Sequence, residues 1–491
     1  MRHLAPAFAF VCLALAGCSS RADEGAVSVA VIGSSDGPFE TGNRLSPAGQ
    51  LVREATSESL VAMNQQGEIV PAIAESWIFT EDGLSYFFRI RNSEWSDGDR
   101  LNAASVRAAL MDRIRSLQGT SLGLDLSKIA EIRVMAERVL EIRLKAPSSD
   151  LLQLLAQPEL GLQTDGQGTG PMRKVSEEAD DHLRLQPIPP ELRGLPQRRD
   201  WDANVLDVVV RGMSARRAVD AFSDGEADVV LNGRLSTLPM ADVGLLSGGS
   251  LRLDAAVGLF ALSYRNREGL LATAERREAL SMAINRDALL QPFNVAGWEP
   301  STRVVPDALF SDRVTAPQRW EGQSLEQRRR IAENRISAWK REENQFASLT
   351  IALPEGPGSN LLFTQLKNDF DAVGVLLTRA KPDEAADLAL IDRLARYASP
   401  RWFLNQFNCD IAKPICSPDA DVLVDQSLYA ATESETEVLL AQAEQALIEA
   451  EAFIPLGAPL RWSLVRGGID GFSENLWGRH PLFPMATAPI S

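Results

Sequence analysis

Histidine and cysteine are scarce in this sequence. Its 491 residues include three histidines, at His3, His182 and His480, and four cysteines. Serine triads need a histidine or another base, and structural zinc sites use clusters of cysteine and histidine. None of the three histidines stands in a recognisable catalytic or metal-binding pattern. We therefore expect no enzymatic activity, no metal and no cofactor.

Positive charge is also in short supply. The sequence has 50 lysines and arginines and 66 aspartates and glutamates, which gives a formal net charge of -16. Nucleic-acid binding normally needs a basic surface, so this class of function is excluded. The hydrophobic share of 45% and the charged share of 24% are ordinary for a globular protein.

A long apolar run occurs once, at the N-terminus. Ala5 to Ala16 is too short to span a bilayer as a mature helix. It ends in Leu15-Ala16-Gly17-Cys18, which resembles the lipobox of bacterial lipoproteins. We expect residues 1–18 to be a signal peptide with lipidated Cys18, and residues 19–25 to be a tether. An ordinary cleaved signal peptide with an incidental cysteine is the open alternative.

The remaining cysteines support an oxidising compartment. Cys12 leaves with the signal peptide and Cys18 carries the lipid, so Cys409 and Cys416 remain as an even pair. We expect a disulfide between them. Metal ligation is the rival interpretation, and it is weak because neither remaining histidine lies near the pair in sequence.

Hydrophobic periodicity predicts an α/β protein without internal repeats. Asn102 is expected to cap a helix with an apolar face from Val106 to Leu117, and the proline-rich stretch 177–204 to connect domains. Strands are expected at Val27–Ile32, Ser85–Ile90, Ile132–Leu144, Val205–Val210, Val229–Leu231, Leu349–Leu353, Val375–Leu377 and Asp387–Ile391. Further helices are expected at Leu51–Met63, Ala215–Phe222, Thr273–Leu290, Asn360–Val373 and Ser434–Ala452, the last with a Ser434/Glu437 capping box.

Several short segments, taken together in order, form a family signature. They are Pro71–Trp77 with Asp82–Arg91, Trp95–Gly98 and Ala103–Val106, then Gly168–Pro171, Asp224–Asp228, Arg276–Leu280 with Ala283–Arg286, and Ile454–Leu456 with Gly471–Phe472. This set resembles the peptide/nickel class of ABC-transporter solute-binding proteins (family 5), and it covers essentially the whole mature chain. Gly168 and Gly170 are expected to be backbone joints, because no lysine follows at the spacing of a phosphate loop.

The resemblance implies a type II periplasmic-binding-protein-like bilobed fold with an additional domain and a hinge. The first lobe is expected to be discontinuous and to combine residues 26–52, 183–258 and 461–491. Residues 53–182 would form the extra domain that carries the signature, and residues 259–460 the second lobe. Such a receptor encloses its ligand when the lobes close.

One segment departs from the family pattern. In peptide-binding members, an aspartate in a pattern close to G-W-x-x-D-Y-x-D-P pairs with the free amino terminus of the ligand. Here residues 392–400 read D-R-L-A-R-Y-A-S-P, so that Arg396 replaces the aspartate and Arg393 the tryptophan. A guanidinium repels an ammonium group and can hold a carboxylate or phosphate through two hydrogen bonds.

This reversal predicts an anionic or zwitterionic solute instead of a peptide bound in the usual way. The alternative is that Arg393 and Arg396 pair with Asp392, Asp387 or Asp410 and face solvent. A shift of one residue in the alignment would remove the argument. Further candidate ligand contacts are Ser34, Ser35 and Asp36 after the first strand, Tyr264 and Asn266 near the crossing between lobes, and Tyr397 and Trp402 beside Arg396.

The leading functional hypothesis is therefore a monomeric, lipid-anchored receptor on the periplasmic or extracytoplasmic face of the membrane. It would capture a small molecule or peptide for an inner-membrane ABC permease. A transport-independent sensing or scaffolding lipoprotein that retains the fold is the open alternative, and a hydrolase is the weaker one.

Overall fold

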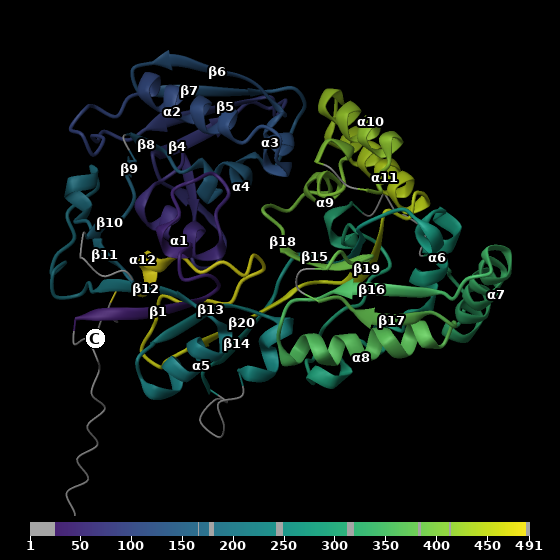
Figure 1. Cartoon of the computed structure of the whole chain (residues 1–491). Coiled ribbons are helices and arrows are strands. Elements are labelled where there is room, and N and C mark those ends of the chain that lie inside the picture. Colours follow the sequence, from purple (N-terminus) through teal and green to yellow (C-terminus); the bar gives the residue numbers. More distant parts are fainter. Residues whose placement is uncertain are drawn as a thin grey trace, which may run out of the picture.

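The structure is a computed structural model, and it describes residues 25–164, 166–175, 181–241, 249–311, 319–381, 384–411 and 414–487. The predicted signal peptide, the lipidation site Cys18 and nearly all of the tether lie outside these residues. The described chain forms a bilobed α/β fold with an additional domain, as the resemblance implies (Figure 1). In the described residues, no helix is both long and apolar enough to cross a membrane.

The first lobe is built on a seven-stranded sheet with the order β10-β11-β12-β1-β13-β20-β14. The alternating run that predicts the first strand forms β1, which is parallel to both β12 and β13 and fully buries Val29 and Val31. The strands are β1 (Ala26–Ile32), β10 (Met172–Val175), β11 (Leu183–Pro187), β12 (Asp207–Met213), β13 (Val229–Arg234), β14 (Leu251–Ala255) and β20 (Leu460–Val465), with helices α1 (Pro47–Thr56), α5 (Ala215–Asp224) and α12 (Leu482–Met485).

The extra domain is built on a four-stranded antiparallel sheet with the order β4-β5-β7-β6. Asp82-Gly83 turns the chain between β4 and β5, with Gly83 at a φ of 66°. Asn102 caps α2 as predicted, because its side-chain oxygen accepts from the backbone N–H groups of Ala104 and Ser105. The elements are β2 (Val61–Met63), β3 (Ile69–Pro71), β4 (Ala74–Phe79), β5 (Ser85–Ile90), β6 (Ile129–Ala136), β7 (Val139–Leu144), β8 (Gln163–Thr164), β9 (Gln167–Gly168), α2 (Ala103–Ser116), α3 (Ser121–Leu126) and α4 (Leu151–Leu155).

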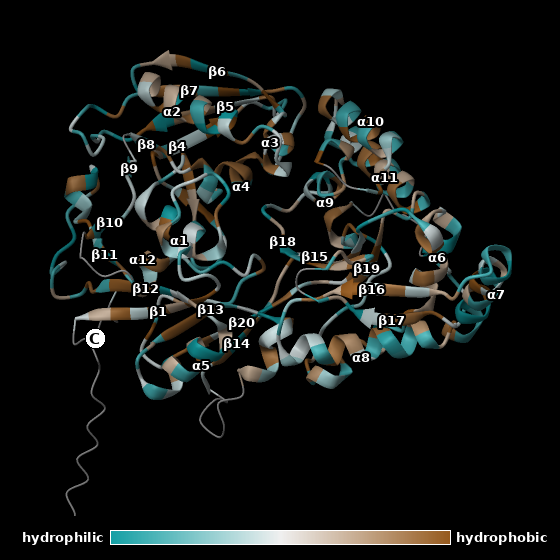
Figure 2. Ribbon diagram, in the orientation of Figure 1, coloured by the Kyte–Doolittle hydropathy of each residue, from teal (hydrophilic) through white to brown (hydrophobic). Residues whose placement is uncertain are grey.

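The second lobe is built on a five-stranded mixed sheet with the order β17-β16-β18-β15-β19. Its strand β16 is strongly hydrophobic, whereas the outer helix α7 is largely hydrophilic (Figure 2). Cys409 and Cys416 form the expected disulfide in this lobe. The elements are β15 (Gly258–Tyr264), β16 (Ser348–Ala352), β17 (Leu376–Arg379), β18 (Leu388–Leu394), β19 (Phe453–Gly457), α6 (Ala274–Ala283), α7 (Leu325–Glu343), α8 (Pro357–Asp371), α9 (Pro400–Asn405), α10 (Pro418–Gln426) and α11 (Glu433–Glu449).

The chain crosses between the two large sheets at two neighbouring places. Strand β14 of the first lobe continues into β15 of the second lobe through residues 256–257, and β19 returns into β20 through residues 458–459. Beside the first crossing, the N–H of Ala395 donates to the carbonyl of Val257. These two crossings form a hinge region between the lobes.

Some predicted elements are wrong in type or in boundary. The helix expected at Leu51–Met63 begins earlier, because Ser46 caps it, and it ends at Thr56; the last predicted residues belong to β2 instead. The strand expected at Ile132–Leu144 is a hairpin of β6 and β7. Thr273 does cap a helix, but α6 ends at Ala283 and only short 3₁₀ turns follow.

Two further expectations need correction. The proline-rich stretch 177–204 contains β11, a strand of the first-lobe sheet with Leu185 fully buried, so this stretch is more than a connection. The helix predicted from Ser434 is capped by Thr432, whose hydroxyl accepts from the backbone N–H of Glu435. The expected Ser434/Glu437 capping box is therefore absent from α11.

Candidate functional site

A cavity of about 520 Å³ lies where the first lobe, the extra domain and the second lobe meet. Its size is typical of sites for small molecules. Its wall includes polar and charged residues from all three parts of the chain: Asn43, Arg44, Ser46, Gln50, Glu54, Thr120, Ser121, Asp125, Gln157, Glu159, Asn232, Arg234, Asp392, Arg393, Arg396, Gln406, Arg461, Arg479 and His480.

The cavity wall is positively charged although the protein is acidic. Six arginines and four carboxyl groups line it, an excess of two positive charges before His480 is counted. The whole chain has a formal net charge of -16. Clefts lined by one sign of charge concentrate ligands of the opposite sign. The wall is therefore suited to an anionic group.

Three of the six arginines are paired with carboxylates. Arg396 contacts Glu159 at 2.6 Å, Arg461 contacts Asp392 at 2.6 Å and Arg479 contacts Glu54 at 2.9 Å. The other three are Arg44, Arg234 and Arg393, and no carboxylate of the described chain forms an ion pair with them. The excess positive charge of the cavity wall therefore comes from these three arginines.

Arg396 joins the second lobe to the extra domain. It follows β18, and Glu159 lies in the 3₁₀ turn Pro158–Leu160 of the extra domain. The neighbouring Gln157 donates from Nε2 to the carbonyl of Arg396 at 2.6 Å. Arg396 therefore lines the cavity, and its charge is balanced by Glu159, which is none of the three aspartates that the sequence suggests as partners.

Arg461 and Arg234 lie side by side on the first-lobe sheet, because Arg234 of β13 is directly opposite Arg461 of β20. Asp392 of β18 pairs with Arg461, so this ion pair links the two lobes beside the hinge crossings. Arg234 shares the region without an acid of its own. Burial, followed by the nearby charge of Arg461, lowers the pKa of Arg234.

Arg393 also belongs to β18, on the second-lobe side of the cavity. Its Nη1 donates to the side-chain oxygen of Gln406 at 3.0 Å, and Gln406 in turn donates to the carbonyl of Trp402. The neighbouring amide orients the guanidinium without neutralising it. Burial and then the charge of Arg396 lower the pKa of Arg393.

The C-terminal segment closes another side of the cavity. Arg479 reaches Glu54 of α1, and burial is the largest cause of the raised pKa of that glutamate. The ring of His480 lies between the carbonyl of Ser473 and the buried carboxylate of Asp254, at 3.1 and 3.0 Å. These contacts hold the segment against the first lobe.

Asp125 of α3 is the most deeply buried acid in the wall. It is fully buried, and it accepts from Nδ2 of Asn405, on α9 of the second lobe, at 2.6 Å. Burial raises its pKa to about 7. This carboxyl group is therefore protonated at a higher pH than an exposed aspartate, and its protonation raises the positive excess of the cavity by one charge.

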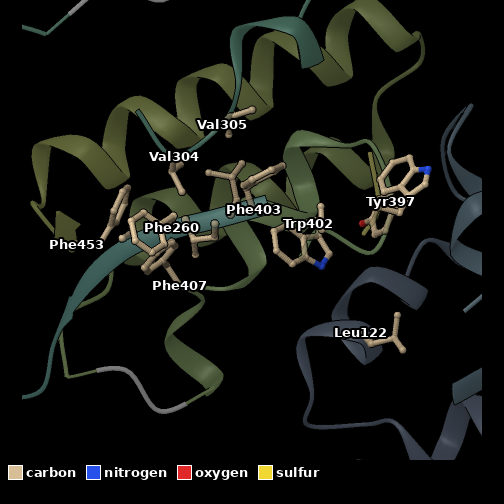
Figure 3. Packing of buried hydrophobic residues seen from close by; sticks show 14 of the residues in the cluster. Leu122, Phe260, Val304, Val305, Tyr397, Trp402, Phe403, Phe407 and Phe453 are labelled. Carbon is tan, nitrogen blue, oxygen red and sulfur yellow. The ribbon is translucent and has the colours of Figure 1, made fainter. Parts of the chain in front are cut away.

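The predicted aromatic residues lie where the extra domain faces the second lobe. Trp402 lines the cavity and packs edge-to-face on Phe403, with ring centroids 4.8 Å apart. Tyr397 is fully buried behind this wall, and the centroid of its ring lies 5.2 Å from Nζ of Lys128. Figure 3 shows Trp402 and Tyr397 on the side of the second lobe that faces Leu122 of α3.

The remaining predicted contacts lie away from the cavity wall. Ser34, Ser35 and Asp36 form an exposed turn after β1. Tyr264 ends β15 at the far end from the hinge and donates to the carbonyl of Arg277, while Asn266 donates to Asp387. Of the candidates, the structure brings Arg393, Arg396 and Trp402 together in the cavity.

Sequence reasoning missed Arg44, Arg234, Asp125 and Glu159. Each lies outside the segment in which the family pattern concentrates attention, and each reaches the cavity only through the tertiary fold. Arg234 lies three residues beyond the predicted strand Val229–Leu231, and it joins that strand only in the structure, where β13 extends to it. Among the described residues, no group of histidine, cysteine, aspartate and glutamate side chains is arranged to hold a metal ion.

Comparisons with known proteins agree with this architecture. The family model described as bacterial extracellular solute-binding proteins, family 5, middle region, matches residues 68–409. The glutathione-binding protein GsiB of Escherichia coli is 25% identical over 320 residues, which cover 60% of this chain and 58% of that protein. The chain thus matches less than two thirds of the length of this curated relative.

Solved structures show the same fold along nearly the whole chain. OppA of Haemophilus influenzae, in complex with the peptide RPPGFSPFR, has a TM-score of 0.78 at 15% identity, over 96% of this chain and 100% of that one. The murein tripeptide-binding protein MppA of Escherichia coli has a TM-score of 0.77 at 17% identity, over 96% and 99%. The unliganded open form of MppA scores 0.63 at 18% identity, over 95% and 98%.

Proposed function

Because the chain belongs to family 5 of the bacterial extracellular solute-binding proteins, we propose that it captures a small anionic or zwitterionic solute between its lobes for an ABC importer. The observation that carries this proposal is the cavity wall with its three unpaired arginines. A receptor of this kind works by binding its ligand more tightly in the closed form than in the open form.

The position of the protein in the cell is part of the proposal. Lipidation at Cys18 would hold the body on the periplasmic face of a membrane, and residues 19–25 would act as the tether. The protein would then meet the permease as a monomer. Loss of membrane association in a Cys18→Ala variant is the expected result, and unchanged association would contradict the anchor.

The charge of the cavity separates this chain from a receptor of neutral peptides. In the register that the family pattern suggests, Arg396 takes the place of the aspartate of peptide-binding members, and its pairing with Glu159 leaves no free carboxylate at that point for an amino terminus. Arg393 and Arg234 remain available to an acid. Glutathione is a reasonable first probe, because a relative bears its name and because it carries carboxylates.

Calorimetry on the purified protein tests the proposal. We expect glutathione and other acidic solutes to bind at least about tenfold more tightly than trialanine, because one hydrogen-bonded charge pair contributes about 1.5–3 kcal/mol. Arg393→Gln should weaken acidic ligands. Arg216→Gln, an exposed arginine on α5 far from the cavity wall, is the matched control and should not. Tight binding of trialanine with no preference for acids would contradict the proposal.

A further inference from the structure

We infer that the cavity selects a solute with two separate acidic groups, one bound by Arg234 on the first-lobe wall and one by Arg393 on the second-lobe wall. This inference rests on the proposed function, because it names the class of solute that the same cavity accepts. It goes further in assigning one arginine of each lobe to one acid of the ligand.

Arg234 is held in place by its backbone, and its side chain remains free. The carbonyl of Arg234 accepts from the indole N–H of Trp462 at 3.0 Å, and it also accepts from the hydroxyl of Thr237 at 3.2 Å. In the described chain, the guanidinium itself has no hydrogen-bond acceptor and no ion pair. A partly buried, positioned and unpaired guanidinium is a ready partner for a carboxylate.

The guanidinium of Arg393, on the second-lobe wall, likewise has no carboxylate partner among the described residues. Its one side-chain contact within the described residues is the neutral oxygen of Gln406. The carboxylates of Asp392, its neighbour on β18, and of Glu159, across the cavity in the extra domain, are engaged by Arg461 and Arg396. The charge of Arg393 therefore also remains uncompensated.

The two arginines belong to two separate charge groups. Asp392 forms an ion pair with Arg461 and also acts electrostatically on Arg234, whereas Glu159 pairs with Arg396, whose charge in turn acts on Arg393. Each group contains two guanidiniums and one carboxylate. Since the first group is centred on the first-lobe sheet and the second on β18 and the extra domain, each wall has one positive charge in excess.

Closure brings these two excess charges to one cavity of about 520 Å³. Like charges repel more strongly as water is excluded, so closure of the empty receptor is opposed. A ligand with a single acid neutralises one wall. A ligand with two acids neutralises both walls and also bridges the lobes, so it favours the closed form more strongly.

Matched ligand pairs test the inference directly. We would compare alanyl-glutamate with alanyl-glutamine, and glutarate with its monoamide, by calorimetry at constant ionic strength. In each pair a carboxylate becomes an amide of nearly the same shape. We expect the diacid to bind at least about tenfold more tightly. Arg234→Gln and Arg393→Gln should each abolish that preference, while Arg216→Gln should keep it.

The outcomes distinguish the two proposals. Equal affinity for both members of each pair overturns the two-acid inference and leaves the receptor proposal standing. Tight binding of trialanine, with no binding of any acidic probe, overturns both.

A measurement without ligand keeps the inference falsifiable if none of these probes fits. At low ionic strength, Arg234→Gln and Arg393→Gln should each make the free protein more compact in solution scattering, because one of the two repelling charges is gone. Added salt should compact the wild type and have less effect on the variants. Scattering curves that are identical for wild type and both variants overturn the inference whatever the ligand is.

Discussion

Two arginine–carboxylate pairs border the cavity with the same contact distance and different surroundings. Arg461–Asp392 and Arg396–Glu159 both meet at 2.6 Å. The side chains of the first pair are 4% and 7% exposed, whereas Arg396 is 27% exposed. The first pair lies beside the two hinge crossings, and the second joins the second lobe to the extra domain.

The two ion pairs have the same chemistry, but their different positions give them different roles. If the lobes open and close as proposed, residues near the hinge would move least, and Arg461–Asp392 would remain buried in both states. Opening would separate the extra domain from the second lobe, so Arg396–Glu159 would be lost and both side chains hydrated. On the proposed function, the hinge pair would therefore stabilise the fold, and the outer pair would stabilise the closed form.

The largest effect should come from breaking the hinge pair. Asp392→Asn leaves Arg461 buried without a counter-charge, and removal of one partner of a buried pair typically costs about 3–5 kcal/mol. We expect urea unfolding to show a loss of this size. The double variant Asp392→Asn/Arg461→Gln should recover part of the loss. A loss below about 1 kcal/mol would contradict the role of the hinge pair.

A smaller effect is expected from the outer pair. Glu159→Gln removes the partner of Arg396, whose guanidinium can reach water by opening of the cleft. We expect the equilibrium between closed and open forms to shift towards open by about 1–2 kcal/mol. Solution scattering should show a larger radius of gyration for the ligand-free variant. A global destabilisation as large as that of Asp392→Asn would remove the distinction between the two pairs.

The smallest effect concerns the buried acid between the same two domains. The pKa of Asp125 is raised to about 7, so the folded state favours its neutral form. Its contribution to stability is fully present below the ordinary pKa of 3.8 and is lost as the pH rises through about 7. Asp125→Asn lacks this titration. From about pH 5 to about pH 8, the melting temperature of wild type should therefore fall relative to that of the variant. Parallel curves would show that Asp125 is solvated.

Much of the fold and part of the site could be predicted from the sequence. The ordered motifs carry the bilobed architecture, and the register of residues 392–400 brings Arg393 and Arg396 to the cavity. Their partners could not be predicted in the same way. Glu159 is 237 residues from Arg396, and Asp125 is 280 residues from Asn405. Such pairs depend on how three separately folded parts meet, which no local pattern encodes.

The failures have similar physical causes. The turn at residues 34–36 follows β1, but the loop and helix at 43–54 line the cavity instead. Tyr264 lies in a strand that starts at the hinge, yet it stands six residues further along, about 20 Å from the crossing. Apolar periodicity could not show that the run Leu51–Met63 breaks after Thr56, because the residues on both sides of the break are buried.

The contact between Gly168, Gly170 and the end of α1 shows where the extra domain is inserted into the first lobe. The N–H of Gly170 donates to the carbonyl of Thr56, and a side chain at either glycine would collide with Thr56 or Ser57. The chain thus leaves the first lobe after residue 56 and returns to it at residue 170, so the extra domain is an insertion in the first lobe. Splicing residue 56 to residue 170 through a short linker would remove the extra domain and yield a minimal two-lobed protein whose cavity lacks one wall.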